Sequence, residues 1–152
     1  MKHLQQLAPD MFAMIERADD SHLRMVCVPI CELAVRRNRP FESVVDEALE
    51  CLRLERRYEQ GLVDRLDALM NRFDDQYFEL KDQAEDAEDD AARQRLTAEY
   101  QALFQKARTV AALRASGDPD AFEAATEAIY EAAASVADKE SIFNIVKQFL
   151  RA

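Results

Sequence analysis

The scarcity of glycine constrains this chain more than any other feature, because only two glycines occur in 152 residues. Tight β-hairpins need residues that accept positive backbone angles, glycine above all. Between Leu62 and Ser116 the chain contains neither glycine nor proline. Apolar residues recur every three or four positions along most of its length, which is the periodicity of amphipathic helices. These features predict an all-α fold, a helical bundle of five to seven helices.

The composition favours one packed domain over a disordered chain. Apolar residues make up 49% and charged residues 33% of the sequence, and a chain of this length is able to bury a sizeable core. No apolar run approaches the length of a membrane span. The N-terminal segment lacks the apolar stretch and cleavage site of a signal peptide. We therefore expect a single all-α domain over residues 1–152, located in the cytoplasm.

The three cysteines are expected to be reduced thiols in a helical core, because their number is odd and no export signal is evident. Cys27 and Cys31 lie one helical turn apart and could bind a metal together with His22, whereas Cys51 stands alone. Structural zinc sites usually use a two-residue spacing and a second cysteine pair, which the sequence lacks. Neither a metal site nor a cofactor is predicted.

Residues 1–60 are expected to form the N-terminal helices. The first begins near Pro9, since proline is favoured at the first position of a helix. The second contains Pro29, which predicts either a kink in a continuous helix or an extended segment over residues 24–28. Pro40 then opens a third helix.

The middle region, residues 61–116, carries two apolar heptad seams. The first consists of Val63, Leu66, Met70, Phe73, Tyr77, Leu80, Ala84, Ala87 and Ala91, and the second of Leu96, Tyr100, Leu103, Ala107 and Val110. The two seams are out of phase by about 200° of helical rotation, so one straight helix would carry two opposed apolar faces. A reversal near Glu88-Asp89-Asp90 removes this conflict, with an aspartate as N-cap of the returning helix. The sequence therefore predicts an antiparallel helical hairpin, about 62–88 and 90–115, in preference to one rod of about 80 Å.

Ser116-Gly117-Asp118-Pro119 is the strongest boundary in the chain. Glycine suits the position just after a helix, aspartate suits an N-cap and proline suits the first turn of the next helix. Asp138 is the expected cap of a last helix. Residues 117–152 are thus predicted to form a C-terminal helix pair.

The net charge of −10 is unevenly distributed along the chain. Residues 1–60 hold 9 Lys and Arg against 11 Asp and Glu, whereas residues 61–152 hold 11 against 19. Such a surface repels nucleic acid and anionic lipid and attracts basic proteins.

The densest group of carboxylates, which we call the acidic strip, is the predicted partner-binding site. Like charges three or four residues apart destabilise an isolated helix by a few tenths of a kcal/mol per pair, so a strip that repels itself gains from a cationic partner. The alternative interpretation is a solvated outer face. Lys81 is the one basic residue within the strip, which consists of Asp74, Asp75, Glu79, Asp82, Glu85, Asp86, Glu88, Asp89 and Asp90.

Two acid pairs support an enzymatic alternative. Glu47-x-x-Glu50 and Glu79-x-x-Asp82 resemble the paired-acid motifs of MazG-type nucleotide pyrophosphohydrolases, an all-α family. The resemblance implies that four carboxylates converge in a cleft and hold magnesium against a triphosphate.

A third interpretation concerns DNA. Residues 24–29 followed by residues 33–49 resemble a ribbon-helix-helix repressor, and this resemblance implies a short strand before Pro29. It also implies phosphate contacts from a cluster of arginines, although cations equally suit a helix C-terminus. The cluster consists of Arg36, Arg37 and Arg39.

We predict from these observations a non-enzymatic cytosolic interaction protein whose acidic helical surface binds a basic partner. The most concrete version is an immunity or antitoxin-like inhibitor that covers the cationic site of a nuclease or related toxin. A chaperone or adaptor shares the same traits. A homodimer also stays open, because heptads pair within one chain or between two.

Overall fold

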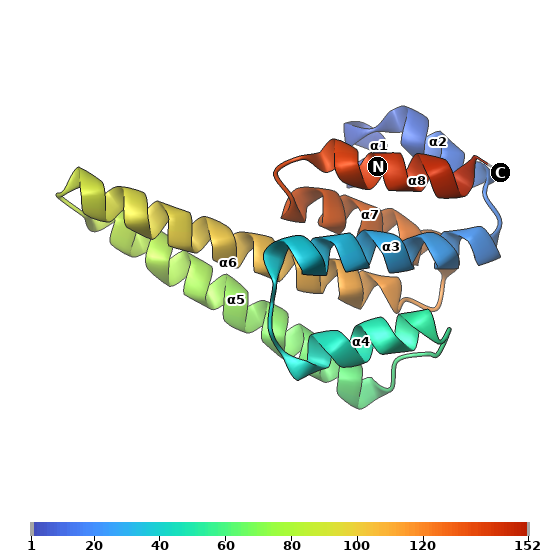
Figure 1. The fold of residues 1–152 in the computed structure, drawn as a ribbon, viewed down its shortest axis with the longest axis horizontal. Coiled ribbons are helices and arrows are strands. Elements are labelled where there is room, and N and C mark those ends of the chain that lie inside the picture. Colours follow the sequence, from blue (N-terminus) through green and yellow to red (C-terminus); the bar gives the residue numbers. More distant parts are fainter. Residues whose placement is uncertain (1, 152) are drawn as a thin grey trace.

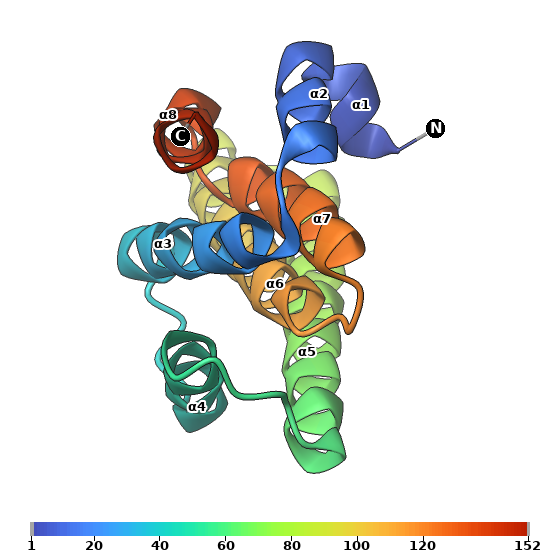
Figure 2. The same ribbon diagram turned by 90° about the vertical axis from the view of Figure 1, so that its right-hand side faces the viewer.

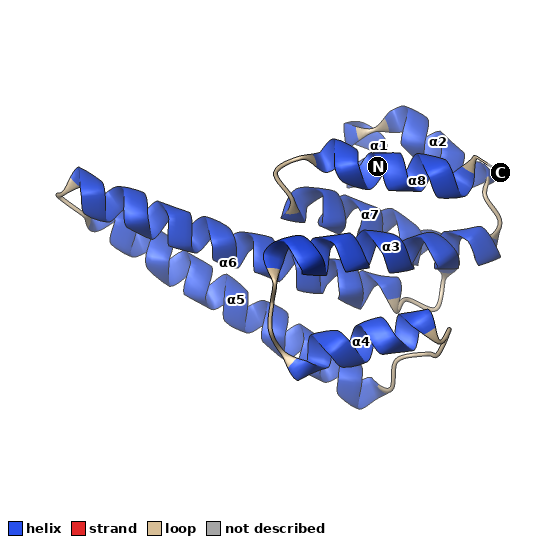
Figure 3. Cartoon of the chain, in the orientation of Figure 1, coloured by secondary structure: helices blue, strands red, loops and turns tan. Residues whose placement is uncertain are grey.

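The computed structural model describes residues 2–151, which form eight α-helices and no strand (Figure 1, Figure 3). The predicted all-α bundle is confirmed. The helix count exceeds five to seven because a short helix precedes the one expected at Pro9. The helices are α1 (His3–Leu7), α2 (Pro9–Arg17), α3 (Asp20–Asn38), α4 (Ser43–Arg53), α5 (Gln60–Asp86), α6 (Asp90–Ser116), α7 (Ala121–Ser135) and α8 (Lys139–Leu150).

The helices pack around α6 and α7. α6 contacts α3, α5 and α7, and the end-on view of Figure 2 shows it surrounded by these three. α8 covers α3 and α7, while α1 and α2 lie over α7. α4 contacts α3, α5 and α6 near the base of the hairpin. We call this assembly the body; the remaining length of α5 and α6 projects from it as a pair of helices (Figure 1).

The antiparallel hairpin is confirmed. α5 ends at Asp86 and α6 begins at Asp90, so the chain reverses near Glu88-Asp89-Asp90 as expected, and Ala91, the last residue assigned to the first seam, lies on α6. Asp89 is the N-cap of α6, and its carboxylate accepts a hydrogen bond from the backbone N–H of Ala91 at 3.2 Å. An aspartate here satisfies one of the N–H groups that a helix start leaves without an intrahelical partner.

Pro29 lies inside a continuous helix, and the extended alternative for residues 24–28 is wrong. α3 is helical from Asp20 to Asn38, so the strand that the ribbon-helix-helix resemblance implied is absent. The missing N–H of a proline removes only one rung of a helical ladder, and the apolar residues of α3 retain the helix by packing. Its buried face contains Leu23, Val26, Cys27, Ile30, Cys31, Leu33 and Ala34.

The boundary after α6 falls where expected, but its details differ. α7 begins at Ala121, and its N-cap is Asp120, whose carboxylate accepts from the N–H of Glu123 at 3.1 Å. Asp118 instead accepts from the N–H of Asp120 at 2.8 Å within the preceding loop. Asp138 caps α8 as predicted.

The core lies in the body, where α3, α6, α7 and α8 meet. Large side chains from these four helices are fully buried there, and α7 adds alanines that let its neighbours approach closely. They include Leu23, Ile30, Leu113, Ile129 and Ile142.

Candidate functional site

The hairpin loses its core where it leaves the body. We call residues 74–106 the arm. The structure describes every residue of this range, and Ala84 is the one buried side chain within it. The last buried residue before the arm is Phe73 and the first after it is Ala107. The arm is therefore two helices packed on each other with no third layer, and it contributes little to the stability of the body.

The acidic strip lies on this arm. Eight of its nine residues are exposed, and Asp74 at the base is half-buried. Asp75, Glu79, Asp82 and Asp86 follow one another at spacings of four, three and four residues, so they share one face of α5 at a rise of about 5 Å per step. That face points away from α6, because the seam that contacts α6 lies on the opposite side of α5.

Few of these carboxylates are neutralised within the chain. Asp74 pairs with Arg108 at 3.4 Å and Asp90 pairs with Arg93 at 3.3 Å, while Asp89 serves as a helix cap. The other six make no ion pair or side-chain hydrogen bond with any residue from 2 to 151. They are Asp75, Glu79, Asp82, Glu85, Asp86 and Glu88.

An exposed aromatic residue stands among the acids. Phe78 is 58% exposed, and it shares its helix face with Asp75 and Asp82, which lie three residues before it and four after it. Tyr77 connects it to the second helix of the arm: the Tyr77 ring lies 5.0 Å from Phe78 and 5.5 Å from Tyr100 between centroids.

Phe104, which is 37% exposed, completes this aromatic cluster at 5.7 Å from Tyr77. Sequence reasoning overlooked both phenylalanines. The signal that could have found them is their place beside the seams. Phe78 follows Tyr77 and Phe104 follows Leu103, and a residue next to a seam position lies about 100° around the helix, on the flank of the helix pair.

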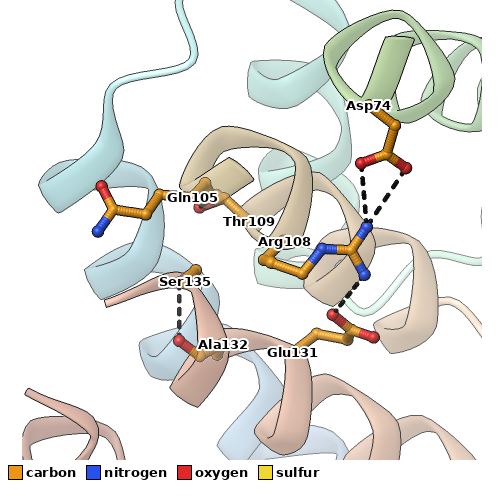
Figure 4. Close-up of polar contacts among 7 residues, drawn as sticks. All are labelled: Asp74, Gln105, Arg108, Thr109, Glu131, Ala132 and Ser135. Atoms are coloured by element: carbon orange, nitrogen blue, oxygen red, sulfur yellow. Dashed lines mark hydrogen bonds and ion pairs between the residues drawn. The ribbon is translucent and has the colours of Figure 1, made fainter. Parts of the chain in front are cut away.

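Arg108 ties the arm to the body (Figure 4). Its guanidinium donates to Asp74 on α5 at 3.4 Å and to Glu131 on α7 at 3.0 Å. Burial raises the pKa of the Glu131 carboxyl above its ordinary value, although the charge of Arg108 opposes that shift. Desolvation thus outweighs the ion pair at this position.

Replacing Glu131 with glutamine is expected to flatten part of the pH dependence of stability. A raised pKa means that the folded chain holds this proton more tightly than the unfolded chain does. The stability that Glu131 contributes is therefore present below the unfolded value of 4.5 and falls as the pH rises through the folded pKa. Urea unfolding at about pH 4 and about pH 7 measures the free energies of unfolding of both proteins. The free energy of Glu131→Gln relative to that of the native protein should be higher at about pH 7 than at about pH 4. A difference that stays constant with pH would contradict this.

The acid pairs of the pyrophosphohydrolase resemblance do not converge. Glu47 on α4 pairs with Arg65 near the start of α5. Glu79 lies fourteen residues further along α5, about 21 Å away at the helical rise. Within residues 2–151 no group of three or more His, Cys, Asp or Glu side chains is arranged to hold a metal ion, so the four carboxylates form no shared site.

The cysteines are free thiols, and two of them are buried as predicted. The Cys31 thiol lies 3.3 Å from the hydroxyl of Ser116 on α6. Burial raises the pKa of the Cys27 thiol to about 11, so it stays protonated near neutral pH and is a poor nucleophile. Cys51 lies on α4 and is half-buried.

Among the described residues, no helix is both long enough and apolar enough to cross a membrane. A search of protein-family models, of curated proteins and of solved structures found no match to this chain.

Proposed function

We propose that this chain is a non-enzymatic cytosolic interaction protein whose arm binds a basic partner protein. The observation that carries the proposal is the exposed Phe78 among carboxylates without partners, on an arm that the core of the body does not need. Like charges on one helix face destabilise the helix, and an exposed aromatic ring leaves apolar surface in water. A basic partner that covers the ring would reduce both free-energy costs.

Charge supports a basic partner. The arm holds ten Asp and Glu, the nine of the acidic strip and Glu99, against four Lys and Arg, which are Lys81, Arg93, Arg95 and Lys106. Six of the carboxylates of the strip have no partner of their own in the described chain. Such a field steers basic proteins toward the arm and speeds their association.

The aromatic cluster supplies binding affinity that the charges alone do not. Exposed ion pairs contribute little affinity, whereas buried aromatic anchors at the centre of an interface contribute much of it. Phe78 occupies the middle of the acidic face, so a partner that covers it also brings cations against Asp75 and Asp82.

The most concrete partner is a toxin or nuclease, with this chain as an immunity or antitoxin-like inhibitor. The carboxylates along α5 present one negative charge per helical turn, about every 5.4 Å. Regular negative charge is what the cationic groove of a nuclease binds when it holds a phosphate backbone. An arm that projects from the body is also narrow enough to enter such a groove.

The test is a triple charge reversal on the arm, Asp75→Lys, Asp82→Lys and Asp86→Lys. Asp89 is left in place because it caps α6. With the chain as bait in its source cells, the captured partner should be basic, and the dissociation constant of the purified pair should rise by about tenfold or more in the variant. An inhibitor would in addition lower the activity of the captured toxin or nuclease.

A matched control carries the same change of charge on the body. Glu16, Glu50 and Glu59 are exposed and make no ion pair with any residue from 2 to 151, so Glu16→Lys, Glu50→Lys and Glu59→Lys alter net charge without touching the arm. This variant should keep the partner. Equal loss in both variants, or loss in neither at unchanged helicity by circular dichroism, would refute the role of the arm.

A further inference from the structure

A cavity of the body lies where α1, the last turns of α7 and the start of α8 meet. Its volume is about 460 Å³, which is within the usual range of small-molecule sites in proteins. No residue of the arm lines it. We call it the α1–α7–α8 cavity, and its lining consists of His3, Gln6, Leu7, Tyr130, Ala133, Ala134 and Lys139.

One part of this lining is apolar and in contact with water. The rings of His3 and Tyr130 lie 5.1 Å apart between centroids, with their planes tilted by 44°. Leu7, four residues after His3 and so on the same face of α1, is 43% exposed. Small side chains of α7, Ala133 and Ala134, leave the space between these groups open. An occupant with a flat apolar part would cover ring and leucine surface that otherwise stays in water.

The polar part of the lining consists of hydrogen-bond donors. An ammonium, a phenol, a primary amide and an imidazole are all able to donate, and none of them makes an ion pair or a side-chain hydrogen bond within residues 2–151. Among the described residues no carboxylate lines the cavity, although 30 of the 152 residues are Asp or Glu. The four donor side chains are His3, Gln6, Tyr130 and Lys139.

The acids closest in sequence to these donors lie outside the lining, and most are engaged elsewhere. Glu127 pairs with a lysine of the N-terminal segment at 3.6 Å, and Glu131 pairs with the arginine at the base of the arm at 3.0 Å. The Asp138 carboxylate accepts from the N–H of Glu140 at 3.1 Å as the cap of α8. The ammonium of Lys139 therefore has no acid of this chain as its ion-pair partner, and it is exposed.

The net charge of −10 opposes the approach of anions at long range. Salt screens exposed charges beyond about 8 Å at physiological ionic strength. The groups that line the cavity therefore decide which charge it accepts, and they include a lysine and no acid.

We propose that the α1–α7–α8 cavity binds a small organic anion with a flat apolar part, an aromatic carboxylate. Its oxygens accept hydrogen bonds from Lys139 and the neighbouring donors, and hydrogen bonds to a charged group are stronger than neutral ones. Its ring lies against Leu7, His3 and Tyr130, where burial of apolar surface adds affinity. The cavity and the arm share no residue, so this inference stands apart from the basic partner proposed for the arm.

Amide NMR of the full chain, titrated with benzoate, tests the proposal. Benzoate should shift the signals of residues 3–7, 130–134 and 139 along one saturable curve with a millimolar dissociation constant, while the signals of the arm stay unchanged. Benzyl alcohol has the ring without the charge, and acetate has the charge without the ring. Each should bind at least about fivefold more weakly than benzoate.

Lys139→Gln should raise the dissociation constant for benzoate by about threefold or more. Lys147→Gln is the matched control, because it removes the same charge from the same helix outside the cavity lining. The control should bind benzoate as the native chain does. The proposal would be overturned by shifts that do not saturate or that spread over the surface. Equal affinity for acetate or for benzyl alcohol, or equal losses in the two lysine variants, would overturn it as well.

Discussion

Replacing Gly117 with alanine is expected to lower the free energy of unfolding by about 1–3 kcal/mol, the usual cost of forcing an extra methyl into a packed site. Gly117 has φ −86° and needs no left-handed backbone. The reason for glycine is the ring of Tyr58, because a Cβ at position 117 would lie 2.2 Å from its Cδ2 and 2.4 Å from its Cε2. The Tyr58 hydroxyl donates to the carbonyl of Leu113 at 2.7 Å, so the ring has little freedom to move aside.

Gly61 is the matched control for this substitution. A Cβ there would meet nothing within 4 Å, so Gly61→Ala should be neutral or stabilise the start of α5 by up to about 1 kcal/mol. Urea unfolding of both variants gives the comparison. In a Tyr58→Ala background, Gly117→Ala should cost far less than it does alone. An equal cost in both backgrounds would show that the contact with Tyr58 is not the cause.

Replacing Leu113 with alanine is expected to cost about 2–5 kcal/mol, whereas the same change at Leu96 should cost less than about 1 kcal/mol. Both leucines lie on α6. Leu113 is fully buried in the body, and Leu96 is half-buried on the arm, where no third layer covers the helix pair. Removing the side chain of Leu113 therefore leaves an enclosed cavity. Removing that of Leu96 leaves a space that is open to solvent.

Urea unfolding measures the two free energies, and amide hydrogen exchange gives an independent check. Residues 74–106 should exchange through local opening at a lower free energy than α3, α6 beyond Ala107, or α7. Equal costs for the two leucine variants, or equal protection of arm and body, would contradict the description of the arm as a helix pair without a core.

Much of the fold follows from local features of the chain. The phase difference between the two seams was enough to predict a reversal, because a helix that changes its apolar face cannot continue straight against one neighbour, although the first seam was extended to Ala91, which lies on α6. Asp89 and Asp138 were identified as caps by residue type and position alone. Sequence periodicity also implied that the acids of α5 face away from α6.

The candidate site was predicted only in part. The acidic strip was found by its density, yet the pairing of Asp74 depended on where α6 brings Arg108 to α5, which no spacing in the sequence reveals. The exposure of Phe78 and Phe104 was also missed, since a single aromatic residue off a seam is equally compatible with contact against another helix. Glu47 and Glu79 looked related by spacing, but Glu47 lies on α4 beside Arg65 near the start of α5, fourteen residues before Glu79.

Short-range interactions thus specify the helices, their caps and the hairpin, because these depend on residues within one or two turns of each other. The packing of distant segments decides everything else. Pro29 stays within a helix because its apolar neighbours are buried on other helices, and Gly117 is needed because Tyr58 approaches it across the fold. The arm is free of the body for the same kind of reason: no third helix comes close enough to cover it.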